Sequence, residues 1–102
     1  MMGCEVRVPA NSQAPDLERL IEECCSAEGL RMTLKGTLAK YPGCVHWHFK
    51  RDRQPGTLEI TLWDREGKVW FPTRPGRTGG WVEDSIERIR QSLEQRLAAL
   101  GE

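Results

Sequence analysis

The chain has 102 residues, no net charge and an apolar fraction of 38%, and this length suffices for one domain with its own hydrophobic core. We therefore predict a single domain over residues 1–102. Zero net charge excludes a strong overall field that would draw the chain to nucleic acid or to a membrane surface, and no apolar run reaches the ~18 residues of a membrane span.

Charges and cysteines are distributed unevenly along the chain. Residues 1–30 carry a net charge of about −4 and residues 31–53 about +5, which predicts an acidic first helix beside basic strands. The four cysteines include the adjacent pair Cys24 and Cys25, a poor framework for disulfides. The first residues lack the basic and apolar regions of a secretory signal. We expect reduced thiols and a cytoplasmic location.

The first thirty residues predict a strand and a helix. Glu5 to Val8 is a candidate edge strand that ends at Pro9. Apolar residues then recur at helical spacing up to Gly29, a residue typical of helix ends. These residues are Leu17, Leu20, Ile21, Cys24 and Ala27. The stripe predicts a helix with Cys24 in the core and Cys25 at the margin of the stripe.

Strict alternation of apolar and polar residues predicts the central strands. Residues 30–39 alternate between Leu30, Met32, Leu34 and Leu38 on one side and Arg31, Thr33, Lys35 and Thr37 on the other. Residues 44–63 form two strands joined by a turn at Pro55-Gly56. Their apolar side carries Val45, Trp47, Phe49, Leu58, Ile60 and Leu62. Their mixed side carries Cys44, His46, His48, Lys50, Thr57, Glu59, Thr61 and Trp63.

The remaining chain predicts a last strand and a long helix. A loop over residues 64–67, with Gly67 at positive φ, leads to a strand over 68–71 in which Lys68 and Trp70 share the mixed side. An irregular connection follows over residues 72–80. A helical stripe then runs through Val82, Ile86, Ile89, Leu93, Leu97 and Leu100.

The predicted order is (β)-α-β-β-β-β-α, an α+β fold in two layers. Both helices would pack on one face of a four-stranded antiparallel meander, with the N-terminal strand as an optional fifth edge strand. This order resembles that of the double-stranded-RNA-binding domain and, with the first strand, the TATA-binding-protein-like arrangement. In the former the last helix begins with lysines, and residues 80–85 here carry Glu83 and Asp84 instead.

The sheet face turned away from the helices, here called the open face, is the predicted place of function. Two tryptophans, two histidines and several cations on an exposed surface favour a covering partner. We predict an interaction module that binds a protein partner or a second copy of the chain. The predicted binding residues are Trp63, Trp70, His46, His48, Lys35, Lys50, Arg74 and Arg77.

Two alternatives remain open. Cations interleaved with aromatic residues, together with the loop over residues 74–80, are typical of nucleic-acid binding. Cys44, His46 and His48 on one strand face, with Glu59 on the next strand, are typical of a zinc site, and a metal-dependent enzyme centred on His46, His48 and Glu59 is the second alternative. No nucleophile elbow or phosphate-binding loop is present in the sequence, and we expect a protein that is not an enzyme and has no resident cofactor.

Overall fold

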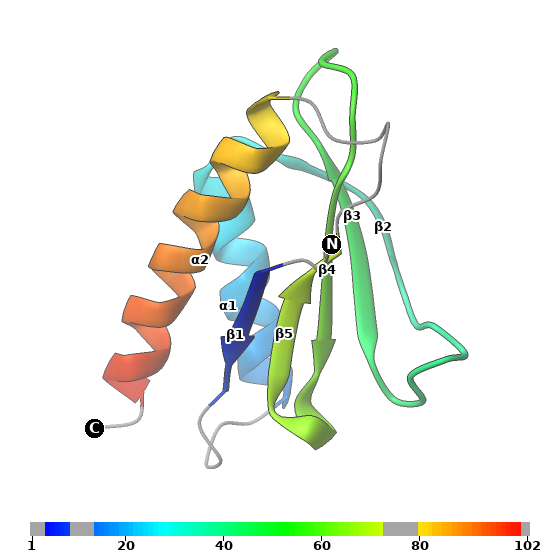
Figure 1. Cartoon of the computed structure of the whole chain (residues 1–102), viewed down its shortest axis with the longest axis vertical. Coiled ribbons are helices and arrows are strands. Elements are labelled where there is room, and N and C mark those ends of the chain that lie inside the picture. The colour runs from blue at the N-terminus through cyan, green and yellow to red at the C-terminus, as the bar shows by residue number, and fades with distance from the viewer. Residues whose placement is uncertain (1–3, 9–13, 73–79, 101–102) are drawn as a thin grey trace.

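The computed structural model describes residues 4–8, 14–72 and 80–100, and Figure 1 shows their arrangement. The helices are α1 (Ala14–Ala27) and α2 (Gly80–Leu100), and the strands are β1 (Cys4–Arg7), β2 (Arg31–Gly36), β3 (Val45–Lys50), β4 (Leu58–Trp63) and β5 (Lys68–Phe71). A 3-10 turn, η1 (Asp64–Glu66), joins β4 to β5. Neither helix of the described ranges combines the length and the apolar character needed to cross a bilayer.

The strands form one sheet in the order β1-β5-β4-β3-β2. Every pair of neighbours is antiparallel, and β2 to β5 follow one another as a meander. Both helices lie on the same side of this sheet (Figure 1). The predicted α+β arrangement of four meandering strands and two helices on one face is confirmed.

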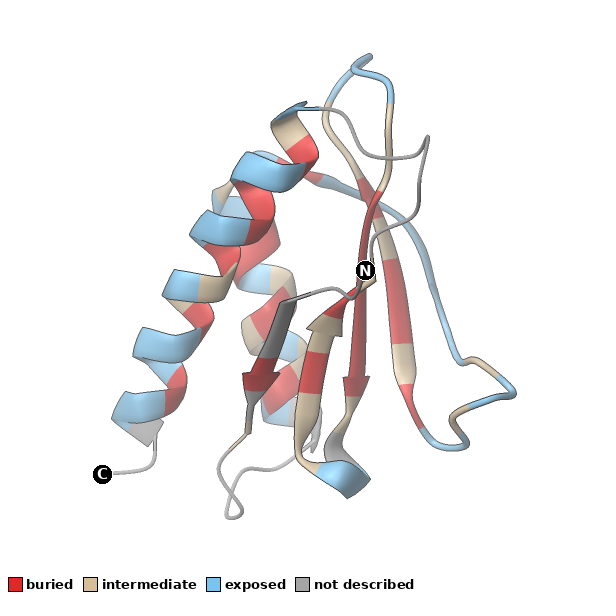
Figure 2. Cartoon of the chain, viewed as in Figure 1, coloured by how far each residue is buried: buried red, intermediate tan, exposed pale blue. Residues whose placement is uncertain are grey.

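The core lies between the sheet and the helices. Figure 2 shows that the helices bury the sides that face the sheet and expose the opposite sides. The strands contribute Trp47, Phe49, Leu58, Ile60, Leu62, Val69 and Phe71 to the core, all of them buried. The alternation in the sequence correctly predicted which side of β3, β4 and β5 faces the core, because successive side chains of a strand point to opposite faces.

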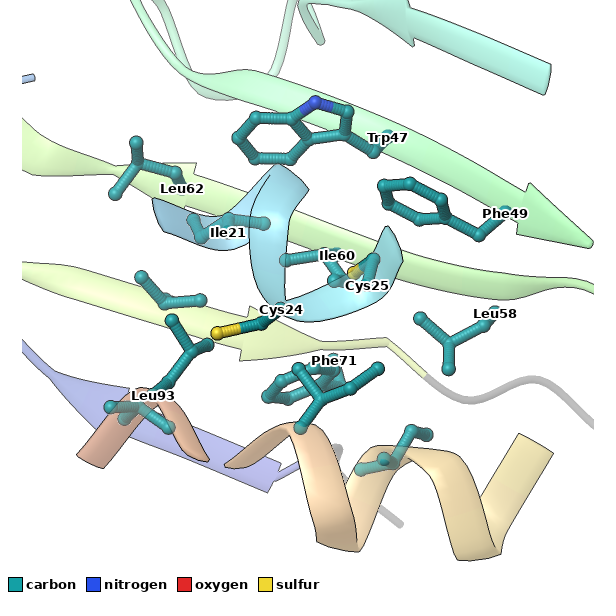
Figure 3. Close-up of a cluster of buried hydrophobic side chains, with 14 of the residues drawn as sticks. Ile21, Cys24, Cys25, Trp47, Phe49, Leu58, Ile60, Leu62, Phe71 and Leu93 are labelled. Carbon is teal, nitrogen blue, oxygen red and sulfur yellow. The ribbon is translucent and has the colours of Figure 1, made fainter. Parts of the chain in front are cut away.

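Helix α1 contacts both the sheet and helix α2. The Sγ atom of Cys24 lies 3.5 Å from Oγ of Ser92 in α2, whereas Cys25 lies over the sheet near Ile60 (Figure 3). Cys25 is completely buried, so its predicted position at the margin of the core is wrong. A helix that packs against two layers needs a wider apolar stripe than one that packs against a sheet alone.

The thiol of Cys25 is expected to resist alkylation in the native protein. Burial raises the pKa of this thiol far above its usual value, and the neighbouring Cys24, Glu22 and Glu28 add to the shift. Because the thiolate is the reactive form, iodoacetamide should modify Cys25 at least ~100-fold more slowly in the native chain than in urea. Mass spectrometry of the tryptic peptide over residues 20–31, with fragment ions that separate Cys24 from Cys25, measures both rates. Equal rates in both conditions would contradict the buried position.

An irregularity in β2 changes which side chains face the helices. The register of β2 against β3 shifts between Met32 and Leu34, so that Met32 pairs with Phe49 and Leu34 with His48. Thr33 is the extra residue, and its Oγ1 donates a hydrogen bond to the carbonyl of His48 at 3.2 Å. A bulge of one residue reverses the alternation beyond it. Leu34 and Lys35 therefore lie on the opposite sides from those predicted.

Lys35 is the functional candidate that this bulge displaces. It pairs with Trp47 across the strands, and its Nζ atom contacts carboxylate oxygens of Glu18 at 3.0 Å and Glu22 at 2.7 Å on α1. The predicted position of Lys35 on the open face is therefore wrong, because the side chain extends toward α1. Its role in this structure is to tie the edge strand to the first helix.

The carboxylate of Glu22 should make stability depend on acid pH. Partial burial would raise its pKa, but hydrogen bonds from Lys35 and from the indole of Trp47, together with the charge of Lys35, outweigh burial and lower the pKa below 4.5. A group whose pKa is lower in the folded state stabilises the fold above its unfolded pKa, and this contribution is lost as the pH falls through the folded value. We expect Glu22→Gln to unfold with a weaker pH dependence than the wild type between about pH 5 and pH 2.5, as measured by urea denaturation. The same pH dependence in both proteins would contradict this assignment.

Candidate functional site

The open face carries the polar residues of the three central strands in register. The cross-strand pairs on this face are His48–Glu59, His46–Thr61, Thr61–Trp70 and Trp63–Lys68. Both histidines come from β3, two residues apart, and therefore point the same way. The sequence predicted that these residues share one face of the sheet, and the structure brings them together in two adjoining groups.

The first group is a cluster of two imidazoles and a carboxylate, here called the His–His–Glu cluster. The Nε2 atoms of His46 and His48 are 3.0 Å apart. Oε1 of Glu59 lies 3.3 Å from Nε2 of His46 and 3.7 Å from Nε2 of His48. Three potential ligand atoms thus converge on one point between β3 and β4, a geometry that can hold a metal ion.

The centre of the open face is buried although α1 and α2, the two described helices, lie on the other side of the sheet. His46, Glu59 and Thr61 expose at most 4% of their surfaces, whereas the side chain of His48 is 26% exposed. Oγ1 of Thr61 lies 2.8 Å from Nδ1 of His46, so the imidazole of His46 contacts hydrogen-bonding groups at both ring nitrogens. The prediction of a solvent-exposed face is therefore corrected, since only its margins are accessible.

The second group is an aromatic pocket of about 180 Å³, lined by Tyr41, Trp63, Lys68 and Trp70. The ring of Tyr41 packs edge-on against both indoles, with centroid distances of 5.0 Å to Trp63 and 5.1 Å to Trp70. The indole N–H of Trp63 donates a hydrogen bond to the carbonyl of Pro42 at 3.1 Å. These contacts hold the two indoles half-exposed at the margin of the open face.

Tyr41 is the site residue that the sequence pattern did not reveal. It belongs to the connection between β2 and β3, which the sequence identifies only as a turn. Alternation places strand residues on a face but says nothing of where a loop residue folds. An aromatic residue immediately before Pro42 and Gly43 was the one available signal, because a turn at these residues can direct the ring back over the sheet.

The other predicted site residues lie elsewhere. Cys44 is buried before β3 begins, and its Sγ atom accepts a hydrogen bond from the N–H of Leu38 at 3.4 Å, so it does not join the His–His–Glu cluster. Lys50 is half-buried at the end of β3, where it pairs with Arg31. Arg74, Arg77 and the rest of the predicted loop over residues 74–80 lie outside the described residues, except Gly80, which begins α2.

A larger, shallow hollow occurs away from these two groups. It has a volume of about 620 Å³ at the turn between β3 and β4 and is lined by Arg31, Asp52, Arg53, Gln54 and Pro55. Within the part of the chain that the structure describes, no aromatic or imidazole group lines it, and all five of these residues are exposed. The two adjoining groups on the open face are therefore the better candidate site.

The fold and the site define an α+β domain whose sheet carries its polar and aromatic chemistry on the face opposite the helices. Comparisons with protein-family models, with curated proteins and with solved structures found no match to this chain. Function is accordingly inferred from the side chains themselves.

Proposed function

We propose that this chain is a small interaction module that binds a partner protein through the aromatic pocket on its open face. The observation that supports this proposal is the pair of half-exposed indoles, Trp63 and Trp70, held in position around a hollow by Tyr41. Tryptophan and tyrosine are enriched among the residues that contribute most binding energy at protein interfaces. Ordered rings lose little conformational entropy when a partner binds.

The lining of the pocket indicates the chemistry of its occupant. Three aromatic rings favour an apolar side chain, and the volume of about 180 Å³ suits one side chain rather than a helix or a strand. Lys68 adds a positive charge to the rim, which favours a carboxylate next to that side chain. We therefore propose that the partner presents an apolar residue beside a carboxylate, as a C-terminal residue does.

N-acetyl-leucine and N-acetyl-leucinamide are suitable probes, because they share a side chain and differ in the carboxylate. We expect N-acetyl-leucine to shift the indole N–H resonances of Trp63 and Trp70 at millimolar concentration. The amide should bind several-fold more weakly. Trp47, which is buried, and Trp81, whose N–H donates to the carbonyl of Pro55, serve as internal controls in the same spectrum.

Lys68→Met provides the matched control for the charge. This variant should bind the acid and the amide equally, because the apolar lining is kept and the ammonium is lost. Absence of any shift at Trp63 and Trp70, or equal shifts at all four tryptophans, would contradict the proposal. If the partner is a second copy of the chain, the sedimentation coefficient of the wild type will also rise with concentration, and Trp63→Ala will remove this rise.

Nucleic-acid binding through the same face is a weaker proposal. Lys35 lies on the helix side, and the edge-on ring of Tyr41 leaves less of both indole faces for a stacked base.

We also propose a cytoplasmic location for the interaction module, since Cys24, Cys25 and Cys44 are all free thiols.

A further inference from the structure

We propose that His46, His48 and Glu59 bind a divalent first-row transition metal ion, for which zinc is the reference ion. The three ligand atoms come from two adjacent strands, in which His48 and Glu59 are direct cross-strand partners. The opposite side of these strands packs in the core, where Trp47 and Ile60 are completely buried. Ligands on rigid elements keep their geometry without the metal and lose little entropy when it binds.

The distances between the three ligand atoms fit a metal ion. They are 3.0 Å between the two Nε2 atoms, and 3.3 Å and 3.7 Å from these atoms to Oε1 of Glu59. In the plane of the three atoms, the point equidistant from them lies about 1.95 Å from each. A point just above this plane is slightly farther from each atom and so reaches the usual zinc–nitrogen and zinc–oxygen bond lengths of about 2.0–2.2 Å. An ion placed just above this plane reaches all three atoms without movement of the backbone.

The close approach of the two imidazoles also favours a cation between them. Two ring nitrogens 3.0 Å apart cannot both present lone pairs, and cannot both present hydrogens, so one proton lies between them when no metal is bound. When a metal ion takes the place of this proton, the proton moves to the other nitrogen of its ring, and both Nε2 lone pairs face the ion. Oγ1 of Thr61, 2.8 Å from Nδ1 of His46, can accept a hydrogen bond from an N–H at that nitrogen, which favours the tautomer whose Nε2 lone pair faces the ion.

The ligand set selects the class of metal. Two imidazole nitrogens and one carboxylate oxygen suit zinc and neighbouring transition metals, whereas calcium and magnesium prefer oxygen ligands alone. Three protein ligands leave a fourth position for water or for a small ligand, as is usual at catalytic zinc sites rather than structural ones. The side chain of His48 is 26% exposed and that of Glu59 only 2%, so the fourth position is reached past His48.

Calorimetric titration with zinc tests this site, on untagged protein that has first been treated with a chelator to remove bound metal. We expect one zinc ion per chain, with affinity reduced more than about 100-fold in His48→Gln and in Glu59→Gln, a larger loss than outer-shell changes produce. Glu66→Gln, which removes an exposed carboxylate from η1, and Trp63→Ala, which alters only the aromatic pocket, should both bind zinc as the wild type does. His48→Gln keeps the test informative if the buried Glu59→Gln variant fails to fold.

The imidazole resonances give a second measurement that is independent of the variants. The chain has only two histidines, so the ring signals in the NMR spectrum come from His46 and His48 alone. Both sets of signals should shift on addition of one equivalent of zinc, and magnesium should leave them unchanged. The absence of zinc binding would overturn the proposal. Zinc binding that persists in His48→Gln and Glu59→Gln, with unchanged imidazole signals, would also overturn it and would assign the bound zinc to other groups such as the thiols.

Discussion

Replacement of Trp47 by alanine is expected to lower the free energy of unfolding by about 3–5 kcal/mol. The indole is completely buried against α1, and its N–H donates a hydrogen bond to Oε2 of Glu22 at 3.0 Å. The ammonium of Lys35 lies 5.8 Å from the ring centre. Alanine would leave a cavity between the sheet and α1 and would remove the donor to Glu22. Urea denaturation, followed by circular dichroism, measures the loss.

Two further variants separate the contributions of size and hydrogen bonding. Trp47→Phe keeps most of the buried area, so it should cost less than Trp47→Ala and should weaken the acid dependence that Glu22 gives to stability. Trp70→Ala removes the same side chain from the half-exposed margin of the open face and should cost much less than Trp47→Ala. A loss below about 1 kcal/mol in Trp47→Ala would contradict the central position of this residue in the core.

The alternation of residues was enough to predict the two central strands and the side of each that forms the core. Trp47, Leu58 and Ile60 are buried as predicted, because a strand with one apolar face turns that face to the core, and a slip of one residue would expose it. The same parity placed His48 and Glu59 on one face, and the register of β3 against β4 makes them direct cross-strand partners. These features depend on sequence spacing alone, which explains why they could be predicted.

Other features depend on local irregularities or on loops and could not be predicted in this way. The extra residue at Thr33 moves Lys35 to the helix side, and nothing in the spacing of residues 30–39 signals a bulge. Tyr41 reaches the indoles because of the path of the connection between β2 and β3. Cys25 is buried over the sheet while Cys24, its neighbour in the chain, contacts α2, so the buried side of α1 is set by packing against elements that are distant in the sequence.

The His–His–Glu cluster lies between these two cases. Parity placed His46, His48 and Glu59 on one face of neighbouring strands, but the separation of their ligand atoms depends on side-chain rotamers. The hydrogen-bonding distance between Thr61 and His46 depends on the same choice. The sequence therefore predicted a candidate group of ligands, and the structure adds the distances on which the zinc proposal depends.

Replacement of Thr61 by valine is expected to weaken zinc binding about 10- to 100-fold. Valine keeps the shape of the completely buried threonine but removes the oxygen 2.8 Å from Nδ1 of His46. Without this acceptor the proton of His46 can occupy either ring nitrogen, and the tautomer that turns its Nε2 lone pair to the metal loses its preference. Calorimetric titration with zinc at constant pH measures the change in affinity.

Thr61→Ser is the matched control, because it restores the hydroxyl and omits only the methyl group. If Thr61 orients the imidazole of His46, the serine variant will recover most of the zinc affinity even where its folding stability is lower than that of the valine variant. If Thr61 serves packing alone, valine will bind zinc as the wild type does, and serine, with its smaller side chain, will be the weaker binder. The order of the two affinities therefore decides between an orienting hydrogen bond and simple packing, because a change in stability alone cannot reverse it.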